Sequence, residues 1–419
     1  MSIIKKRGYM KFNNEINKMR NNNIIILYNN NTGEWIKLSR ECYELLERII
    51  SERIEEDKVY SLFVNEEDKN YFKLLIKRLK EMNIILSTDN IKNTNSITGA
   101  SISVTNNCNL RCKHCCLSAG NSKIEMLDAY PVLDKISRIN IRQLVITGGE
   151  PLLRKDIINI MRYAKERIPQ ISLLTNGTLI DNSLAKFIAI FCQAVSISLD
   201  GYDSKSCSMI RGQGIYEQVI KSIKYLQEYG MKNISLSMTI TRFTFNHVEE
   251  FKELCKNLGV GYVLRRYAPT GRGYDNMKCF IDTVEDNRKL KKELKIKYTD
   301  SYSVKSYNTT CGALKYQFHV GSDGWIYPCS GSELSEFKIE LLNNIDDIED
   351  YFKNSRFQYS EGYRNFSNIL TGKFLPCSNC NICSFCRGCP IYTYLYKKHG
   401  ILQSYCKNKK QKLENLIWE

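Results

Sequence analysis

Three cysteines lie within eight residues of one another, in the segment Cys108-Asn-Leu-Arg-Cys112-Lys-His-Cys115. Thiolates at this spacing hold three corners of an iron–sulfur cube, whereas a [4Fe–4S] cluster has four irons to ligate. One iron therefore stays open to a group that is not protein. The alternative is a structural zinc loop, which requires four ligands in a closed tetrahedron. Cys116 offers a fourth thiol, but adjacent cysteines rarely both reach one ion, so the segment favours an iron–sulfur centre.

Length and cysteine content limit the class of protein. At 419 residues the chain is long enough for two or three domains. The longest nearly apolar run, Phe187 to Ile197, is too short to span a membrane, and the first residues lack the apolar region of a signal peptide. We therefore expect a cytoplasmic protein without a membrane span. In that reducing compartment the 17 cysteines are metal ligands, catalytic groups or buried side chains, not disulfides.

The net charge of +16 raises the question of a nucleic-acid partner. Lysines are spread along the whole chain, and no basic stripe interleaved with aromatic residues is present of the kind that binds RNA. The charge therefore indicates a solvated basic surface and no nucleic-acid binding. An acidic peptide is the next partner that such a surface favours.

Residues 1–92 read as a small separate unit. Apolar runs at Ile24–Tyr28 and Trp35–Leu38 predict two short strands joined by an Asn- and Gly-rich turn. Ser39 and Asn65 are typical N-caps and predict two helices, and an apolar run at 84–86 predicts a last strand. This order is typical of a winged-helix-like module. The polar stretch 87–99 reads as a linker.

Residues 93–300 alternate between strands and helices. Amphipathic segments such as 157–168 and 216–229 separate the apolar runs and predict helices. Six such units predict an α/β fold with a parallel sheet curled into a partial (βα)6 barrel, which carries its chemistry at the C-terminal ends of the strands. The cysteine loop follows the first strand at that end. The strands are expected at 101–105, 144–147, 171–175, 194–199, 234–240 and 261–265.

A second motif, Thr147-Gly-Gly-Glu-Pro151, follows the second expected strand. Two glycines permit close backbone approach, and the carboxylate beside them can hold an ammonium group. Together with the cysteine loop, this motif resembles the radical SAM superfamily, whose members bind the amino group of S-adenosylmethionine (SAM) there and cleave SAM to a radical. The resemblance implies SAM contacts at Gly148, Gly149, Glu150, Asn176, Ser198, Asp200 and Arg211.

Residues 301–419 are rich in cysteine. By spacing alone, one or two zinc sites are the alternative reading of the Cys-x2-Cys pairs. The pattern also resembles the SPASM extension of radical SAM enzymes, which implies two auxiliary [4Fe–4S] clusters and three clusters in all. By that resemblance an outer cluster is held by Cys377, Cys380, Cys386 and Cys406, and an inner one by Cys311, Cys329 and Cys389.

The inner set departs from the SPASM pattern because it has three obvious thiolates instead of four. Cys383 lies in the run of Cys-x2-Cys spacings from Cys377 to Cys389, which we call the cysteine ladder. Cys383 could supply the fourth thiolate, as could Cys279. Otherwise one iron of the inner cluster stays open and could bind a substrate thiolate. The spacing of two residues between Cys386 and Cys389 resembles that of the thioether-forming branch.

These resemblances predict a function. The chain resembles maturases that form Cys-sulfur-to-carbon thioether crosslinks in ribosomally made peptides (sactipeptide and ranthipeptide synthases), as in bacteriocin biosynthesis. The N-terminal unit resembles a leader-peptide recognition module, so the expected partners are a precursor peptide and a flavodoxin- or ferredoxin-like reductant. The alternatives are another SPASM peptide modification (C–C crosslinking, epimerisation or side-chain oxidation) and a non-catalytic Fe–S or zinc interaction protein.

Overall fold

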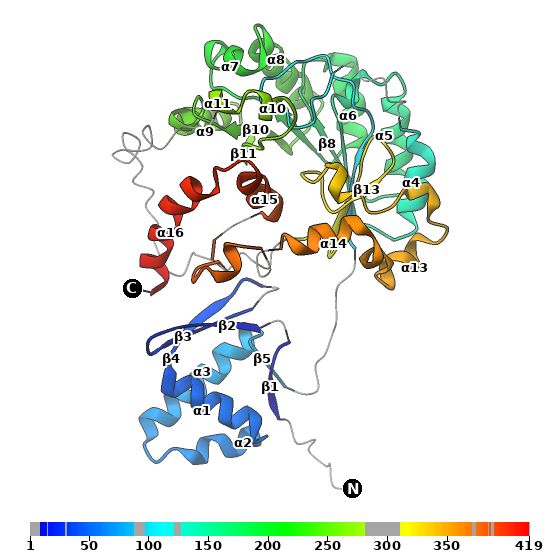
Figure 1. The fold of residues 1–419 in the computed structure, drawn as a ribbon. Helices are drawn as coiled ribbons and strands as arrows, with labels where there is room; N and C mark the ends of the chain where they lie inside the picture. Colours follow the sequence, from blue (N-terminus) through cyan, green and yellow to red (C-terminus); the bar gives the residue numbers. More distant parts are fainter. Residues whose placement is uncertain are drawn as a thin grey trace.

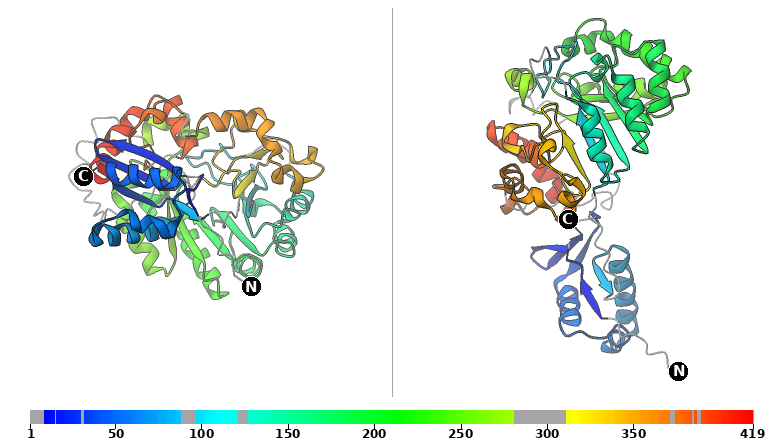
Figure 2. Two further views of the ribbon diagram at one scale, coloured as in Figure 1. Left: turned by 90° about the horizontal axis from the view of Figure 1, so that it is seen from below. Right: turned by 90° about the vertical axis from the view of Figure 1, so that its right-hand side faces the viewer.

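The computed structural model in Figure 1 describes most of the 419-residue chain. A large sheet with its helices lies above a smaller N-terminal unit, and the C-terminal helices lie between them (Figures 1 and 2). The described residues are 9–14, 16–29, 32–87, 97–120, 127–280, 311–370, 374–383, 385–386 and 389–418.

In the described part of the N-terminal unit, two antiparallel sheets pack with helices. Ser39 caps the first helix by accepting a hydrogen bond from the backbone of Cys42, and Asn65 caps the longest helix through the backbone of Glu67, as their sequence positions predict. Strand β1 pairs with β5, and the second sheet has the order β2-β3-β4. The elements are β1 (Met10–Phe12), β2 (Ile16–Asn21), β3 (Ile24–Asn29), β4 (Trp35–Ser39), α1 (Arg40–Ser51), α2 (Glu56–Val59), α3 (Glu66–Glu81) and β5 (Ile85–Ser87).

The main sheet has the order β11-β10-β9-β8-β7-β6-β12-β13 within the described residues. All pairs from β6 to β11 are parallel, so the predicted fold class, an α/β fold on a parallel sheet, is confirmed. The strands are β6 (Gly99–Ser103), β7 (Gln143–Thr147), β8 (Gln170–Thr175), β9 (Ala194–Ser198), β10 (Ile234–Ile240), β11 (Gly261–Arg266), β12 (Gln317–Val320) and β13 (Ile326–Tyr327).

The helices of this region alternate with the strands, as in βαβ units. The helices between β6 and β11 are α4 (Ala129–Ser137), α5 (Ile157–Lys165), α6 (Asn182–Phe191), α7 (Ser204–Arg211), α8 (Ile215–Glu228) and α9 (Val248–Asn257). After β11 come α10 (Gly271–Asp275), α11 (Met277–Phe280), α13 (Ile348–Lys353), α14 (Glu361–Asn368), α15 (Pro390–Lys398) and α16 (Leu402–Trp418).

The two faces of the main sheet differ in character. One face contributes buried aliphatic side chains, such as Ile102, Ile146 and Leu236, to the core formed with the helices. The residues between them point to the opposite face, because side chains alternate along a strand. That inner face carries small polar side chains: Ser101, Ser103, Thr147, Ser172, Ser196, Ser198, Ser235, Ser237 and Thr239. Small hydroxyl side chains leave room for a ligand inside the curve of the sheet.

Strand β12 extends the sheet beyond the six predicted strands. It pairs in parallel with β6, so that His319 lies opposite Ser101, and β13 then turns back antiparallel. The sequence did not reveal this pairing, since the two strands are separated by more than 200 residues and β12 has only four. The C-terminal region is thus built directly onto the sheet that carries the cysteine loop.

The N-terminal unit contacts the C-terminal segment through an apolar cluster. Ile26 and Tyr28 of β3 are buried with Ile382, Phe385 and Ile417. The ring of Phe385 meets that of Trp35 edge-on, with centroids 5.1 Å apart. Because Phe385 lies between Cys383 and Cys386, the N-terminal sheet packs against the cysteine ladder itself.

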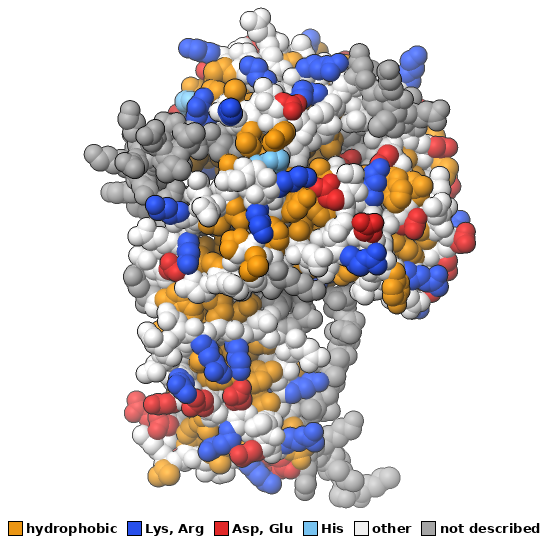
Figure 3. Space-filling model, in the orientation of Figure 1, with side chains coloured by type: hydrophobic (Ala, Val, Ile, Leu, Met, Phe, Trp, Pro, Cys, Tyr) orange, Lys and Arg blue, Asp and Glu red, His pale blue; other side chains and the backbone are white. Residues whose placement is uncertain are grey.

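The surface in Figure 3 carries lysines and arginines dispersed among acidic side chains rather than gathered in one stripe. Among the described helices, none combines the length and apolar character that crossing a membrane requires.

Candidate functional site

The cysteines at 108, 112 and 115 lie on an irregular loop that follows β6, at the C-terminal edge of the parallel strands. The backbone of this loop is held at several points. Cys108 N donates to Gly120 O at 3.1 Å, and Arg272 donates from Nε to Cys112 O at 3.1 Å and from Nη1 to Ala119 O at 2.7 Å. Burial raises the pKa of the Cys108 and Cys112 thiols, and the neighbouring loop cysteines add to this shift.

Hydrogen-bond donors face two of the sulfurs. Leu110 N lies 3.4 Å from Cys108 Sγ, and Asn176 Nδ2 lies 3.9 Å from the same sulfur. Arg211 Nη1 lies 3.8 Å from Cys112 Sγ. Donors of this kind stabilise metal-bound thiolates and tune the potential of a cluster.

The Gly148-Gly149 pair is fastened to the strand that leads into the cysteine loop. Gly149 N donates to Thr105 O at 2.7 Å, and Glu150 N donates to Asn107 O at 2.8 Å. A Cβ on Gly148 would lie 2.3 Å from Thr105 O, and Gly148 has a φ of +142°. A Cβ on Gly149 would lie 2.3 Å from Asn107 O. Only glycine fits at either position, so the motif sets the distance between the second strand and the cysteine loop.

Glu150 is fully buried beside this Gly148-Gly149 pair, which we call the strap. Its Oε1 accepts from Thr175 Oγ1 at 2.7 Å and from Leu152 N at 3.1 Å, and its Oε2 accepts from Asn176 N at 2.7 Å. Burial raises the pKa of Glu150, although these bonds act in the opposite direction. The carboxylate thereby joins the ends of β7 and β8.

Asp200 and Arg211 form a buried ion pair beneath the cysteine loop. Arg211 Nε lies 2.7 Å from Asp200 Oδ2, and His114 Nε2 lies 3.1 Å from the same oxygen. Thr239 N donates to the other oxygen at 2.6 Å. Burial would raise the pKa of Asp200, but Arg211 and His114 outweigh it and hold the pKa well below its usual range. Asp200 is therefore bonded within the protein, and its predicted contact with SAM stays a prediction.

Some buried polar atoms near the cysteine loop lack a hydrogen-bond partner among the described residues. They include the buried Ser196 Oγ on the inner face of the sheet and His114 Nδ1 on the cysteine loop. Ser198 lies two residues beyond Ser196, at the C-terminal end of β9 and on the same face. Because buried hydroxyls are normally hydrogen-bonded, the unpaired Ser196 hydroxyl indicates that a polar group of a ligand reaches the inner face of the sheet.

Arg272 is a site residue that the sequence analysis missed. It clamps the cysteine loop from outside, between two glycines that allow close contact: a Cβ on Gly271 would lie 2.7 Å from Cys116 O, and one on Gly273 would lie 2.8 Å from Ala268 O. The Gly271-Arg272-Gly273 triplet in the segment that follows the sixth strand is the signal that could have identified Arg272. His114 was missed as well, because nothing in the sequence indicates its partner.

The C-terminal cysteines form two groups. Burial, together with the nearby Cys389 and Cys311, raises the pKa of Cys329 to about 12. These three are the predicted inner set. Burial also raises the pKa of Cys377 to about 12, with contributions from Cys406, Cys386, Cys380 and Cys383. The structure therefore places Cys383 beside the predicted outer set, and Cys279 lies on α11 near Tyr267.

Residues 102–255 match the family model of the radical SAM superfamily. These residues form a radical SAM domain. A mycofactocin maturase, MftC of Mycolicibacterium smegmatis, is 26% identical over 300 residues, which are 67% of this chain and 74% of that protein. The AdoMet-dependent heme synthase of Nitratidesulfovibrio vulgaris is 26% identical over 317 residues, 68% of this chain and 85% of that enzyme.

Among solved structures, Streptococcus suis SuiB has the same fold, with a TM-score of 0.52 and 19% identity over 91% of this chain and 98% of SuiB. SuiB has also been solved bound to its precursor peptide SuiA. The likeness therefore extends beyond the radical SAM domain to both ends of the chain.

The superfamily implies a [4Fe–4S] cluster and SAM, and the residues present fit both. Three thiols with hydrogen-bond donors at their sulfurs fit the cluster, and the unpartnered Ser196 hydroxyl on the polar inner face fits a polar ligand. Among the described residues, no three His, Cys, Asp or Glu side chains converge on a position for one metal ion. In an iron–sulfur cube each thiolate binds a different iron, so this convergence is not what the cluster requires.

Proposed function

We propose that the protein is a radical SAM maturase that forms thioether crosslinks between a cysteine sulfur and a carbon atom in a ribosomally made precursor peptide. The observation that carries the proposal is the combination of a radical SAM domain with two further cysteine groups and an N-terminal unit in one SuiB-like fold. In this proposal residues 1–92 recognise the leader, 93–300 form the radical SAM unit, and 301–419 form a SPASM unit with two auxiliary clusters.

When bound, the cluster and SAM supply a 5′-deoxyadenosyl radical, which removes a hydrogen atom from the peptide. The peptide cysteine would lose its thiol proton and bond through sulfur to the carbon radical, and a cluster held by one of the two C-terminal cysteine groups would accept the electron released. Glu150 and the Gly148-Gly149 strap position SAM beside the cysteine loop. The Asp200–Arg211 pair holds the loop from below, and a flavodoxin- or ferredoxin-like protein supplies the reducing electron.

The inner cysteine group supports thioether formation over other SPASM outcomes. Cys389 lies close enough to Cys311 and Cys329 to raise the pKa of both thiols. Cys383 instead acts on Cys377 of the outer group. Three thiolates leave one iron of a four-iron cluster without a protein thiolate. That iron would bind the substrate cysteine as a thiolate and hold it for attack.

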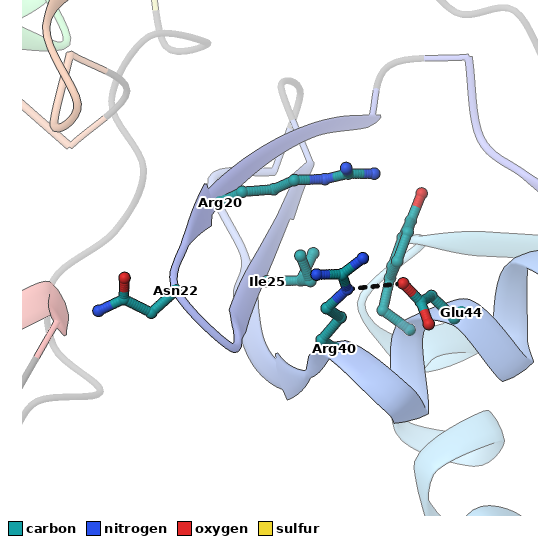
Figure 4. A pocket seen from close by; sticks show the side chains of 6 residues that line it. Arg20, Asn22, Ile25, Arg40 and Glu44 are labelled. Carbon is teal, nitrogen blue, oxygen red and sulfur yellow. Dashed lines mark hydrogen bonds and ion pairs between the residues drawn. The ribbon is translucent and has the colours of Figure 1, made fainter.

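The leader would bind by adding a strand to the exposed edge of β2, where main-chain hydrogen bonds supply affinity. Beside this edge lies a hollow of about 90 Å³ (Figure 4). Arg20 and Arg40 point into it; Arg40 Nε bonds Glu44 at 2.7 Å, and Arg20 lies over the Tyr43 ring. An acidic leader side chain fits this hollow.

The function is tested with candidate precursors, which are short cysteine-containing peptides sought among the reading frames that neighbour the gene. Incubation with SAM and reductant should remove two hydrogen atoms per crosslink, and tandem mass spectrometry should place each link between a cysteine and another residue. A core peptide with Ser in place of Cys should stay unmodified. A C–C link, an epimer or an oxidised side chain in the wild-type product would replace the thioether assignment, and unchanged SAM would favour a non-catalytic protein.

We expect Arg20→Glu to weaken leader binding about tenfold, or about 1.4 kcal/mol, because it places a negative charge where an acidic side chain would sit. Fluorescence polarisation with a labelled leader measures the change. Lys77→Glu, an equal charge reversal on an exposed position of α3, should leave the affinity unchanged. Equal affinities for both variants would remove the Arg20 hollow from the leader site.

A further inference from the structure

One pair of titratable side chains inside the fold is not used by the chemistry proposed above. His319 on β12 is fully buried, and its Nε2 lies 2.7 Å from Glu333 Oε1. Ser103 Oγ donates to the same oxygen at 2.9 Å. On the other side of the ring, His319 Nδ1 lies 2.7 Å from Ser101 Oγ. A histidine and a carboxylate in direct contact form a group that can accept and share a proton.

The pair lies on the inner face of the sheet. His319 is opposite Ser101 in the register of β12 with β6, and Ser101 and Ser103 belong to the polar face that the SAM-binding residues share. All the described bonds of Glu333 go to Oε1, and its side chain retains 15% exposure. Among the bonds that the described residues make, none goes to the second carboxylate oxygen, which leaves it as the oxygen that can take a proton.

The surroundings of Glu333 connect the cysteine loop with the inner cysteine group. Ser103, which donates to Glu333 Oε1, is the last residue of β6, the strand that leads into the cysteine loop. Tyr327 of β13 lies opposite His319 in the register of β13 with β12. At the far edge of the sheet, Arg265 of β11 donates from Nε to Ser237 Oγ at 2.6 Å on the same inner face. Ser332 hydrogen-bonds both backbone groups of Cys329, and Glu333 directly follows this turn, so it lies close in sequence to the predicted inner ligand.

We propose that Glu333, positioned and assisted by His319, accepts the thiol proton of the substrate cysteine. This inference rests on the proposed function and adds the group that deprotonates the sulfur. A thiol that binds iron as thiolate, or that attacks a carbon radical, must release its proton, and metal binding to thiols does release protons. Iron lowers the strength of base that is needed but does not itself take the proton.

The proton transfer balances without any further reactant. The S–H bond of the substrate breaks, its electron pair stays on sulfur, and the proton passes to Oε2 of Glu333. His319 Nε2 and Ser103 Oγ stay bonded to Oε1 and hold the carboxylic acid that has formed in place. The thiolate that remains is the species that the proposed crosslinking step consumes.

A purely structural role for the pair would be to fasten β12 to β6. The pH dependence of crosslinking separates the two roles, because a fastening bond does not set the protonation state of a substrate thiol. The groups that face Glu333 are His319, Tyr327 and Cys116, with Arg265 across the space. None of them offers a second carboxylate to replace it.

The test compares Glu333→Gln with wild type at several pH values, with both crosslinked peptide and 5′-deoxyadenosine measured. At pH 7 we expect crosslinking by the variant to fall about 100-fold, while 5′-deoxyadenosine continues to form and the iron content is unchanged. The crosslinking rate of the variant should then rise about tenfold per pH unit toward the thiol pKa of about 8.5, whereas the wild-type rate stays nearly flat.

Glu333→Asp keeps a carboxylate and should retain the flat profile at a reduced rate, so it decides the matter if Glu333→Gln does not fold. Glu336→Gln, a nearby glutamate that bonds Tyr394 and Lys398, serves as the matched control and should behave as wild type. A flat profile in Glu333→Gln, or a steep one in Glu333→Asp, would overturn the inference. The type of crosslink found in the wild-type product tests the proposed function independently of this inference.

Discussion

Replacing Cys108, Cys112 and Cys115 together by Ala is expected to abolish SAM cleavage. The protein reconstituted without oxygen should contain about twelve irons, and the triple variant about eight, because one cube of four is lost. The two proposed auxiliary clusters should remain, since their predicted cysteine ligands lie on other segments of the fold. Iron analysis and chromatography of 5′-deoxyadenosine measure both outcomes.

Cys116→Ala is the matched control for iron content, since Cys116 is adjacent to Cys115 but lies outside the spacing that holds the cube. This variant should retain about twelve irons. If the triple variant still forms 5′-deoxyadenosine, the assignment of the radical-generating site is wrong. A loss of four irons from Cys116→Ala instead would move the ligand set by one residue.

The sequence was informative where a local pattern has one physical solution. Ser39 and Asn65 are caps in the structure because a helix start needs an acceptor for its free N–H groups. The apolar runs at Leu144, Ile171 and Val195 form parallel strands in the structure. Their side chains are buried in the core, and their backbones pair with the neighbouring strands. The Gly148-Gly149-Glu150 motif was recognised by its position after the second expected strand and downstream of the cysteine loop.

The sequence was not informative where distant segments meet. The pairing of β12 with β6 depends on a strand of four residues whose partner is more than 200 residues away. Arg272 and His114 hold the cysteine loop through bonds whose partners no spacing rule specifies. The packing of Phe385 against Trp35 was equally hidden, because an aromatic residue inside a cysteine ladder carries no periodic signal.

This packing changes how the N-terminal unit is best studied. Removing residues 1–92 would expose Ile382, Phe385 and Ile417, which the strands β3 and β4 cover. Exposed apolar side chains beside the outer cysteine group would disturb that group as well as leader binding. A single charge reversal such as Arg20→Glu leaves this interface in place, so its effect on the leader is easier to interpret than that of a deletion.

Gly149→Ala is expected to reduce the rate of SAM cleavage about 100-fold. The added Cβ would lie 2.3 Å from Asn107 O and 2.8 Å from Asn107 C, both of them backbone atoms that cannot rotate away. Relief requires the strap to move off the strand that leads to Cys108, and overpacking of this kind costs about 1–3 kcal/mol. A displacement of about 1 Å between reacting groups lowers a rate about 100-fold.

Gly261→Ala provides the comparison, because a Cβ there would meet its nearest neighbour, Ile234 O, at an ordinary 3.6 Å. We expect this variant to fold, bind SAM and form 5′-deoxyadenosine like wild type, while Gly149→Ala loses about 100-fold in cleavage rate. Calorimetric titration with SAM shows whether the loss arises in binding. Wild-type cleavage in Gly149→Ala would mean that the strap does not set the distance between SAM and the cysteine loop, and SAM would then depend on other contacts along the inner face of the sheet.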